Sequence, residues 1–374
     1  MKATRREILK TFLAGAGGAV CRFAAPVNGG DNPVSDHEAM AYRKLDEKRI
    51  ECLLCPRNCR VADMERGYCG VRENQGGTYK TLVYARPCSI HTDPVEKKPL
   101  FHFKPGSIAF SLATAGCNVE CKFCQNWEIS QFRPEDVANV YLPPDQVAEA
   151  ARRAKEASGK PCCIAYTYSE PVVFFEYMFD CARAGNHMGV DSVMISNGYI
   201  TETPMKELVR HLKAVKIDLK GFSEKFYKEM VNAELKPVLD TLLLLRKENV
   251  YFEIVTLLIP TLNDSDEELK SLCKWIHDNL GEDVPVHFTR FNPCYKVKNL
   301  PPTPVGTLQR AWRIGQAEGL HYVYVGNVAG HPGEHTSCPK CGKKLIERYS
   351  FTIIANRIKD GKCCDCGNPI PGVW

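Results

Sequence analysis

The stretch CNVECKFC, residues 117–124, directly follows a short apolar run at 108–113. Its three cysteines, Cys117, Cys121 and Cys124, have the spacing C-x3-C-x2-C. Three thiolates at this spacing bind three irons of a 4Fe-4S cubane and leave the fourth iron without a protein ligand. An open iron is available to the amino and carboxylate groups of a bound molecule. A closed zinc site needs one more ligand, so a zinc knuckle that lacks one is the alternative interpretation.

The chain beyond residue 106 alternates short apolar, β-rich runs with helical patterns. Seven such runs separated by six helices predict consecutive right-handed βαβ units and therefore an α/β fold with a parallel sheet, a partial (β/α)6-type TIM-like barrel. Chemistry in such folds gathers at the carboxyl ends of the strands. The predicted strands are 108–113, 162–168, 191–196, 214–219, 251–258, 284–289 and 321–325, and helices are predicted at 144–158 and 266–280.

Further motifs lie within the loop, directly after it and upstream of it. Phe123 precedes Cys124, and this loop with an aromatic residue at that position resembles the hallmark of the radical S-adenosylmethionine (radical SAM) superfamily. The stretches DPVEKKPLFHF, residues 93–103, and CQNW, residues 124–127, resemble the AmmeMemoRadiSam-system radical SAM enzymes, which are relatives of the pyruvate formate-lyase activating enzyme. The resemblance covers residues 50–374, and it implies that Phe123 contacts the cofactors.

The resemblance assigns roles to polar residues after the second and third predicted strands. Glu170, in the stretch 166–171, stands where the superfamily has Gly-Gly-Glu, and it is implied to hold the methionyl ammonium of SAM, although both glycines are absent. Ser196 and Asn197 are implied to meet the ribose hydroxyls of SAM. A glutamate that caps a loop and an Asn-Gly turn are the structural alternatives for these positions.

The fourth and sixth predicted strands also end in polar residues. Asp218 and Lys220 resemble the Asp-x-Lys of the activating enzymes, in which the lysine pairs with the methionyl carboxylate of SAM. Two residues apart on a strand, they point the same way and could equally form a buried ion pair. His287 and Arg290 are expected to complete the SAM or substrate pocket, although a lone strand histidine is often a core residue.

The resemblance also implies a reaction. A low-potential electron donor of flavodoxin or ferredoxin type reduces the cluster, and SAM is cleaved to methionine and a 5′-deoxyadenosyl radical that removes hydrogen from a substrate. Relatives among the activating enzymes take this hydrogen from a backbone glycine of a partner enzyme. The sequence leaves open whether this chain acts on a partner protein or on a small molecule.

A second cysteine set lies near the C-terminus. Cys338 and Cys341 form one C-x2-C knuckle, and Cys363 and Cys366 form another. Two such knuckles can place four thiolates tetrahedrally, so this spacing predicts a zinc ribbon. Because all four ligand positions are filled, we expect a structural zinc ion.

A third set lies upstream of the predicted barrel, at Cys52, Cys55, Cys59 and Cys69. It supplies four thiolates for a metal site. We expect zinc here first, with an auxiliary 4Fe-4S cluster as the second interpretation.

Composition restricts the function classes. The 374 residues are 44% apolar and 25% charged, which is typical of a globular protein and excludes a disordered or fibrous chain. The 19 cysteines, gathered mainly in the three sets, suit metal ligation in a reducing compartment better than disulfides. The net charge of +5 is scattered along the chain, so we expect no nucleic-acid partner. A zinc-ribbon RNA- or protein-binding module with a structural cluster is the alternative function.

The first residues have a different character from the rest of the chain. Arg5 and Arg6 precede a short apolar run at 11–20 that resembles a twin-arginine export signal. This run is too short to span a bilayer, which takes about 20 residues. Because SAM and low-potential electron donors are cytoplasmic, we expect cytoplasmic maturation, and the leader leaves open export or membrane attachment. The predicted units are a leader and linker at 1–36, a cysteine-rich module at 37–105, the radical SAM barrel at 106–330 and the zinc ribbon at 331–374.

Overall fold

The computed structural model describes residues 32–374. The predicted twin-arginine motif at Arg5 and Arg6 and the apolar run at 11–20 lie outside the described residues. Within residues 32–374, no helix is both long enough and apolar enough to cross a membrane.

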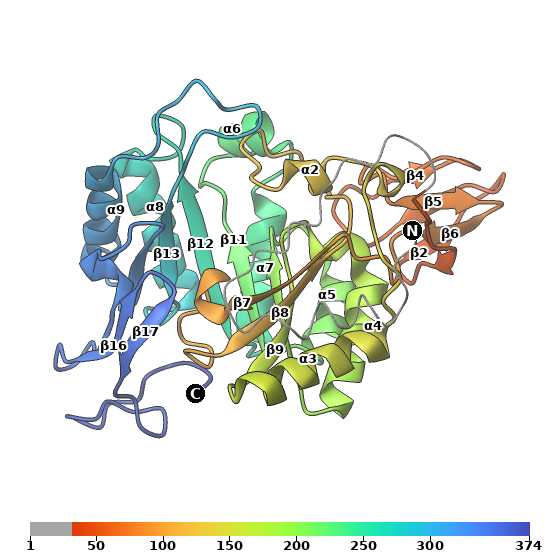
Figure 1. The fold of residues 1–374 in the computed structure, drawn as a ribbon. Helices are drawn as coiled ribbons and strands as arrows, with labels where there is room; N and C mark the ends of the chain where they lie inside the picture. The colour runs from red at the N-terminus through yellow and green to blue at the C-terminus, as the bar shows by residue number, and fades with distance from the viewer. Residues whose placement is uncertain (1–31) are drawn as a thin grey trace.

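An eight-stranded sheet forms the centre of the molecule (Figure 1), and its order is β14-β13-β12-β11-β10-β9-β8-β7. Strands β8 to β14 are parallel to their neighbours, and β7 pairs antiparallel with β8 at one edge. The seven predicted strands are confirmed, each to within two residues at either end. The strands are β7 (Ser89–Pro94), β8 (Ile108–Ala113), β9 (Cys162–Tyr166), β10 (Asp191–Ser196), β11 (Ala214–Asp218), β12 (Phe252–Leu258), β13 (Val286–Arg290) and β14 (Val323–Gly326).

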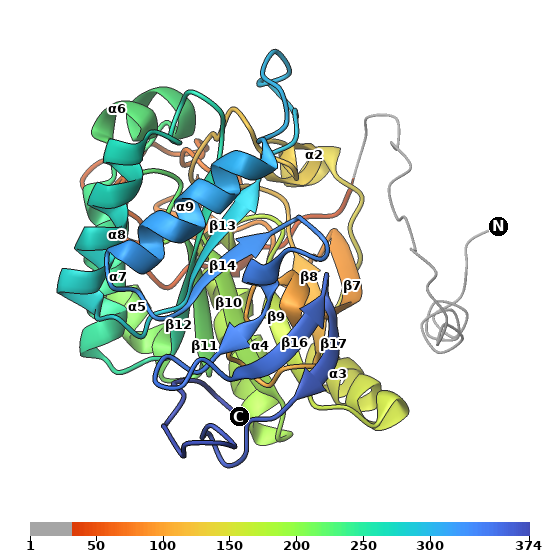
Figure 2. The ribbon, with the colours of Figure 1, turned by 90° about the vertical axis from the view of Figure 1, so that its left-hand side faces the viewer.

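Helices connect successive parallel strands and cover the outside of the sheet (Figures 1 and 2). The predicted helices at 144–158 and 266–280 are confirmed as α3 and α8. Local sequence explains their ends: the Ser265 hydroxyl accepts a hydrogen bond from the Glu268 N–H at the start of α8, and Gly159 closes α3 with a φ of 64°. The six connecting helices are α3 (Pro144–Ser158), α4 (Phe175–His187), α5 (Glu202–Val209), α7 (Lys236–Lys247), α8 (Asp266–Leu280) and α9 (Val305–Ala317).

The segment 95–103 fills the inner side of the sheet, and we call it the plug. It begins with a 3-10 helix, η1 (Val95–Lys97), and its buried side chains Val95, Leu100 and Phe103 form one apolar cluster with inward residues of the strands. In the sequence this segment stands out only through its family resemblance, and β7 was not predicted, because its residues are mostly half-buried or exposed. The inner face is therefore packed with side chains.

Small antiparallel sheets flank the central sheet at its two ends (Figures 1 and 2). The N-terminal ones are β1-β6-β5 and β2-β3-β4, and the C-terminal one is β15-β16-β17. Their strands are β1 (His37–Glu38), β2 (Tyr42–Lys44), β3 (Ile50–Cys52), β4 (Arg60–Val61), β5 (Arg72–Gln75), β6 (Thr78–Thr81), β15 (Thr336–Ser337), β16 (Lys344–Tyr349) and β17 (Thr352–Asn356).

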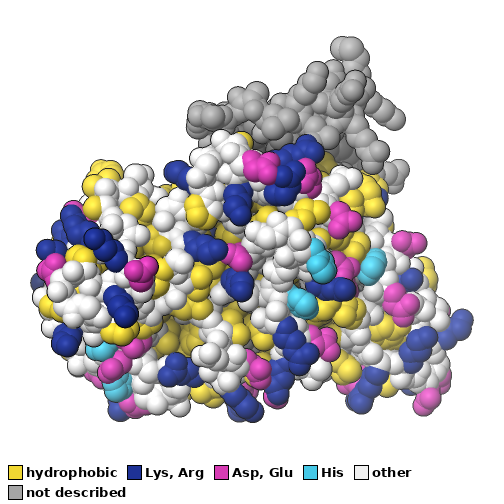
Figure 3. All heavy atoms as spheres, turned by 90° about the horizontal axis from the view of Figure 1, so that it is seen from below, with side chains coloured by type: hydrophobic (Ala, Val, Ile, Leu, Met, Phe, Trp, Pro, Cys, Tyr) yellow, Lys and Arg dark blue, Asp and Glu magenta, His cyan; other side chains and the backbone are white. Residues whose placement is uncertain are grey.

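Two buried arginines attach these sheets to the centre. Arg72 on β5 donates to both carboxylate oxygens of Glu176 on α4, and both side chains are almost fully buried. Arg348 on β16 donates to the carbonyl of Phe101 in the plug at 2.7 Å. The C-terminal sheet therefore holds the plug in place. Viewed from below, acidic and basic side chains are interspersed with apolar ones across the face (Figure 3).

We predict that Phe103→Ala lowers the free energy of unfolding by about 3–5 kcal/mol, because Phe103 is fully buried in the plug. Phe351→Ala removes the same ring from a surface position that is 38% exposed and should change it by no more than about 0.5 kcal/mol. Urea unfolding of both variants measures this difference. Equal losses would contradict a structural role for the plug.

Candidate functional site

The three cysteines Cys117, Cys121 and Cys124 lie on the loop between β8 and the short helix α2 (Trp127–Ser130). Cys121 is buried, and the other two are half-buried. Burial and the neighbouring cysteine and acidic groups raise the pKa of Cys121 to about 12, despite the opposing charge of Lys220. Such a thiol loses its proton when a metal cation replaces it. The chemistry and placement of the three thiols fit ligation of an iron–sulfur cluster.

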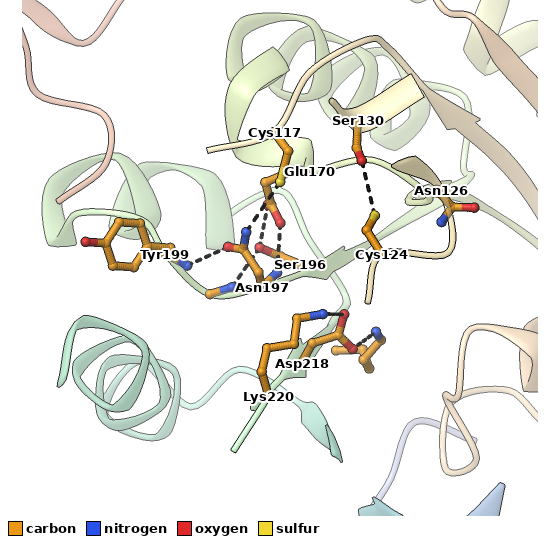
Figure 4. A network of polar contacts seen from close by, with 12 residues as sticks. Cys117, Cys124, Asn126, Ser130, Glu170, Ser196, Asn197, Tyr199, Asp218 and Lys220 are labelled. Carbon is orange, nitrogen blue, oxygen red and sulfur yellow. Dashed lines mark hydrogen bonds and ion pairs between the residues drawn. The ribbon is translucent and has the colours of Figure 1, made fainter. Parts of the chain in front are cut away.

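Glu170 lies just beyond the end of β9, beside the cysteine loop (Figure 4). Its Oε1 accepts hydrogen bonds from the Ser196 hydroxyl at 2.6 Å and from the Val172 N–H at 3.1 Å, and its Oε2 accepts one from the Asn197 N–H at 2.8 Å. The side chain is buried, and burial raises its pKa to about 7. Among the described residues, no cationic side chain forms an ion pair with this carboxylate.

Asn197 connects this carboxylate to the cysteine loop (Figure 4). Its Nδ2 lies 3.9 Å from Cys117 Sγ and donates to Asn118 Oδ1 at 2.9 Å, while its Oδ1 accepts the N–H of Tyr199 at 2.8 Å. The predicted residues Ser196 and Asn197 therefore lie with Glu170 and Cys117 in one network. The hydrogen bonds of Ser196 and Asn197 orient Glu170 and the cysteine loop.

Asp218 and Lys220 form the ion pair that the spacing allowed, with Lys220 Nζ 2.9 Å from Asp218 Oδ2. Lys216, on the same face of β11, contacts the other oxygen of Asp218. Burial by itself would raise the pKa of Asp218, but the two ammonium groups outweigh it and hold the pKa at about 2. Burial opposes the charge of Lys220, but Asp218, Cys121 and Cys124 together raise its pKa above its usual value. Lys220 therefore stays cationic beside the cysteine loop.

The remaining predicted site residues are Phe123, His287 and Arg290. The Phe123 ring is buried and packs against Phe226, with the centroids 5.9 Å apart. His287 is buried, and its Nε2 lies 2.6 Å from Glu253 Oε2. Its ring packs between the plug and β14. Arg290 donates to the carbonyl of Thr303 at 2.9 Å. The structure gives neither His287 nor Arg290 a contact with Glu170 or the cysteine loop.

Sequence reasoning missed residues that complete the network. Asn118 donates to the carbonyl of Tyr199 at 2.7 Å, and Asn126 donates to the carbonyl of Tyr168 at 2.8 Å. Asn126 thus ties the end of the cysteine loop to the turn that carries Glu170. The alternation of side chains along a strand could have found Lys216, two residues before Asp218, and the CQNW stretch contains Asn126, whereas no local pattern marks Asn118.

The C-terminal cysteines come together as the knuckle spacing predicts. The sulfurs of Cys338 and Cys366 are 3.6 Å apart, and those of Cys341 and Cys363 are 3.7 Å apart. All four sulfurs lie within 4.8 Å of one another, so they could hold one metal ion.

The N-terminal cysteines also converge. Cys52 ends β3, Cys55 and Cys59 follow on the loop to β4, and Cys69 precedes β5. All four line one hollow, together with Tyr79 and Asn118.

The chain is similar to known proteins over most of its length. The family described as the radical SAM superfamily matches residues 111–274. The uncharacterized protein MJ0808 of Methanocaldococcus jannaschii is 43% identical over 335 residues, which cover 89% of this chain and 98% of that protein. The chain belongs to the radical SAM superfamily.

Other radical SAM proteins are more distant. The pyruvate formate-lyase-activating enzyme of Listeria monocytogenes is 25% identical over 187 residues, which cover 46% of this chain and 70% of that enzyme. A radical SAM methyltransferase from Sphaerobacter thermophilus has a TM-score of 0.47 and 18% identity, over 64% of this chain and 71% of that one. Within the superfamily, this chain lies in the branch of the pyruvate formate-lyase-activating enzymes.

We predict that Glu170 makes the stability of the SAM-free protein fall with rising pH. The folded state holds a proton on this carboxyl up to about pH 7, well above its usual pKa. Folding therefore takes up a proton between these two values, and stability decreases as pH rises through that window. Glu170→Gln lacks this dependence, so its free energy of unfolding should rise relative to wild type from pH 5 to pH 8.

Urea unfolding across this pH range measures the effect. The exposed Glu207→Gln is the control for loss of a carboxyl group. If the free energies of unfolding of wild type and Glu170→Gln change in parallel with pH, Glu170 titrates normally and the prediction is wrong.

Proposed function

We propose that this chain holds a 4Fe-4S cluster on Cys117, Cys121 and Cys124 and carries out hydrogen abstraction with SAM. When bound, the cluster and SAM supply reductive carbon–sulfur cleavage and a 5′-deoxyadenosyl radical, with the electron coming from a flavodoxin- or ferredoxin-type donor. The observation that carries this proposal is the buried Glu170 carboxylate, which has hydrogen-bond donors but no ion pair with a described residue. A buried anion of this kind is best stabilised by a cationic ligand.

Glu170 would receive the methionyl ammonium of SAM. Its three hydrogen bonds fix the direction of the carboxylate before the ligand arrives, which reduces the entropy lost on binding. The neighbouring Ser169 hydroxyl is buried and has no partner, so it is a further polar atom available to SAM. These features fit a bound amino acid moiety.

Lys220 would receive the methionyl carboxylate. Asp218 holds the Lys220 ammonium at 2.9 Å, and Lys216 offsets part of the negative charge of Asp218. Lys220 therefore stays oriented and cationic close to the cysteine loop. With Glu170 and Lys220, the chain offers one charge of each sign to a zwitterionic ligand.

For the substrate, we favour a segment of a partner protein, as in the activases of this branch. A cavity of about 620 Å³ opens beside Cys117, between the cysteine loop and the N-terminal module. Its lining includes Met64 and Phe132, which are 70% and 42% exposed, together with charged side chains. Exposed apolar side chains around an open cavity suit contact with another chain. Around this chemistry we propose four units: a leader and linker at 1–36, a cysteine-rich module at 37–105, the barrel at 106–330 and a zinc ribbon at 331–374.

Cys121→Ala should abolish formation of 5′-deoxyadenosine from SAM, because the cluster loses a ligand. The assay uses anaerobically reconstituted protein with dithionite and SAM. The control is Cys364→Ala, because Cys364 is exposed and belongs to none of the three cysteine sets. This change should leave the rate of 5′-deoxyadenosine formation within about twofold of wild type. If wild type forms no more 5′-deoxyadenosine than Cys121→Ala does, the proposed function is refuted.

A glycyl radical on a partner protein is the expected product if the activase assignment is correct. The reduced protein and SAM are incubated with lysate of the source organism, and electron paramagnetic resonance (EPR) should detect a glycyl doublet. Deuterium transfer from a small metabolite into 5′-deoxyadenosine, without any protein radical, would overturn the activase assignment but leave SAM cleavage intact.

We also propose that the C-terminal cysteines bind zinc. A tetrahedral zinc ion about 2.3 Å from each thiolate sets the sulfurs about 3.8 Å apart. The distances of 3.6 and 3.7 Å between paired sulfurs agree with this geometry. Zinc would hold together the sheet that anchors the plug.

Cys341→Ser should remove about one zinc ion per chain, since it takes away one of four ligands. Cys364→Ser changes an adjacent but unliganded cysteine and should retain the metal. Plasma mass spectrometry of the purified variants measures zinc and iron. Unchanged zinc in Cys341→Ser, or iron lost in its place, would contradict the assignment.

A further inference from the structure

The four N-terminal cysteines, Cys52, Cys55, Cys59 and Cys69, are spaced differently from the C-terminal four. Among the described residues, the C-terminal set is the one cysteine group whose sulfurs all lie within 4.8 Å of one another. No three of the N-terminal sulfurs meet that limit, although the four cysteines line the same hollow. A single zinc ion requires sulfurs about 3.8 Å apart. In the structure, the N-terminal sulfurs are therefore not gathered in the way that one zinc ion would hold them.

The cysteine loop provides an internal comparison. Cys117, Cys121 and Cys124 also lie outside the 4.8 Å limit. In a cubane each thiolate binds a different iron, so the sulfurs are farther apart than around one ion. Like the cluster-binding loop, and unlike the C-terminal set, the N-terminal set is not compact in the structure.

The walls of this hollow are suited to a cluster. They include the apolar side chains Leu54, Val172 and Val173, all buried, and the almost fully buried Tyr79. On the outer side, the Arg57 guanidinium lies 3.4 Å from the centre of the Tyr68 ring. Apolar walls limit the access of water, which helps to control the stability and potential of an iron–sulfur centre.

The hollow directly adjoins the cysteine loop. Gly116, immediately before Cys117, has a φ of 96°, and a Cβ there would lie 3.1 Å from the Cys69 carbonyl oxygen and 2.5 Å from Val71 Cγ1. Arg57 Nε donates to the carbonyl of Asn118 at 2.6 Å. Asn118 also lines the hollow, and both Cys69 and Cys117 line the cavity of about 620 Å³. The segments that carry the two cysteine sets are therefore direct neighbours.

We infer that Cys52, Cys55, Cys59 and Cys69 bind a second 4Fe-4S cluster, next to the cluster on Cys117, Cys121 and Cys124. This inference goes beyond the proposed function, because SAM cleavage needs only the three-cysteine loop. Four thiolates fill one position on each of four irons. The second cluster therefore has no open iron and does not bind SAM.

The test uses the full chain with the first site removed by Cys117→Ala, Cys121→Ala and Cys124→Ala. After anaerobic reconstitution with ferrous iron and sulfide, this triple variant should retain about half of the roughly eight irons bound by wild type. Dithionite should give it a cluster EPR signal that SAM leaves unchanged. The inference would be overturned if the triple variant bound no iron but bound zinc, and if the further change Cys55→Ala removed that zinc.

The reciprocal variants test the assignment of ligands. Cys55→Ala and Cys59→Ala should each lose about half of the iron and keep a cluster signal that SAM perturbs. Cys162→Ala, which removes a buried cysteine outside all three sets, should retain the full iron content. If the N-terminal variants fail to fold, the triple variant still decides, because its N-terminal module is intact.

Contact between the two sites gives an independent readout. In doubly reduced wild type, each cluster should relax the spin of the other, so its EPR signals should saturate at higher microwave power than those of the single-cluster variants. Identical saturation in wild type and in the triple variant would contradict adjacent clusters. If wild type does not cleave SAM, but the triple variant and the N-terminal variants each retain about half of the iron, the proposed function is refuted and this inference stands.

Discussion

Burial of the Glu170 carboxylate is the constraint around which the site is arranged. An ionised carboxylate away from water is unstable unless donors and a positive charge compensate it. The donors come from two segments: Val172 follows the same turn, and Ser196 and Asn197 end the neighbouring strand. They meet because β9 and β10 are parallel and in register, with Tyr166 paired to Met194. The charge is left for a ligand, beside the loop that carries Cys117 (Figure 4).

Much of this arrangement could be predicted from sequence. Strands of a parallel sheet are buried on both faces, so 162–166 reads as a continuous apolar run and 191–196 has an apolar centre at 193–195. The helices α3 and α8 carry clear apolar stripes, so the sequence pattern predicts both at their full lengths. The family resemblance selected Glu170 and Asn197, and because all carboxyl ends of the strands face one way, the topology predicts that they lie close together.

The remainder depends on contacts between distant segments. The edge strand β7 has no apolar pattern, and three charged residues at 96–98 interrupt the plug, although Val95 and Phe103 in it are fully buried. His287 looked available for the pocket, but Glu253 on the adjacent strand binds its imidazole. The metal preference of the N-terminal cysteines was also open, since spacing along the chain does not give the distances between sulfurs.

The central claim is that three thiolates leave one iron open for the amino acid moiety of SAM, with Glu170 and Lys220 flanking it. Electron–nuclear double resonance on the reduced protein with ¹⁵N-labelled SAM tests this directly. The labelled amino nitrogen should show hyperfine coupling to the cluster spin in wild type and in Cys364→Ala. A cluster spectrum without any coupling to the label, in protein that binds SAM, would contradict the claim.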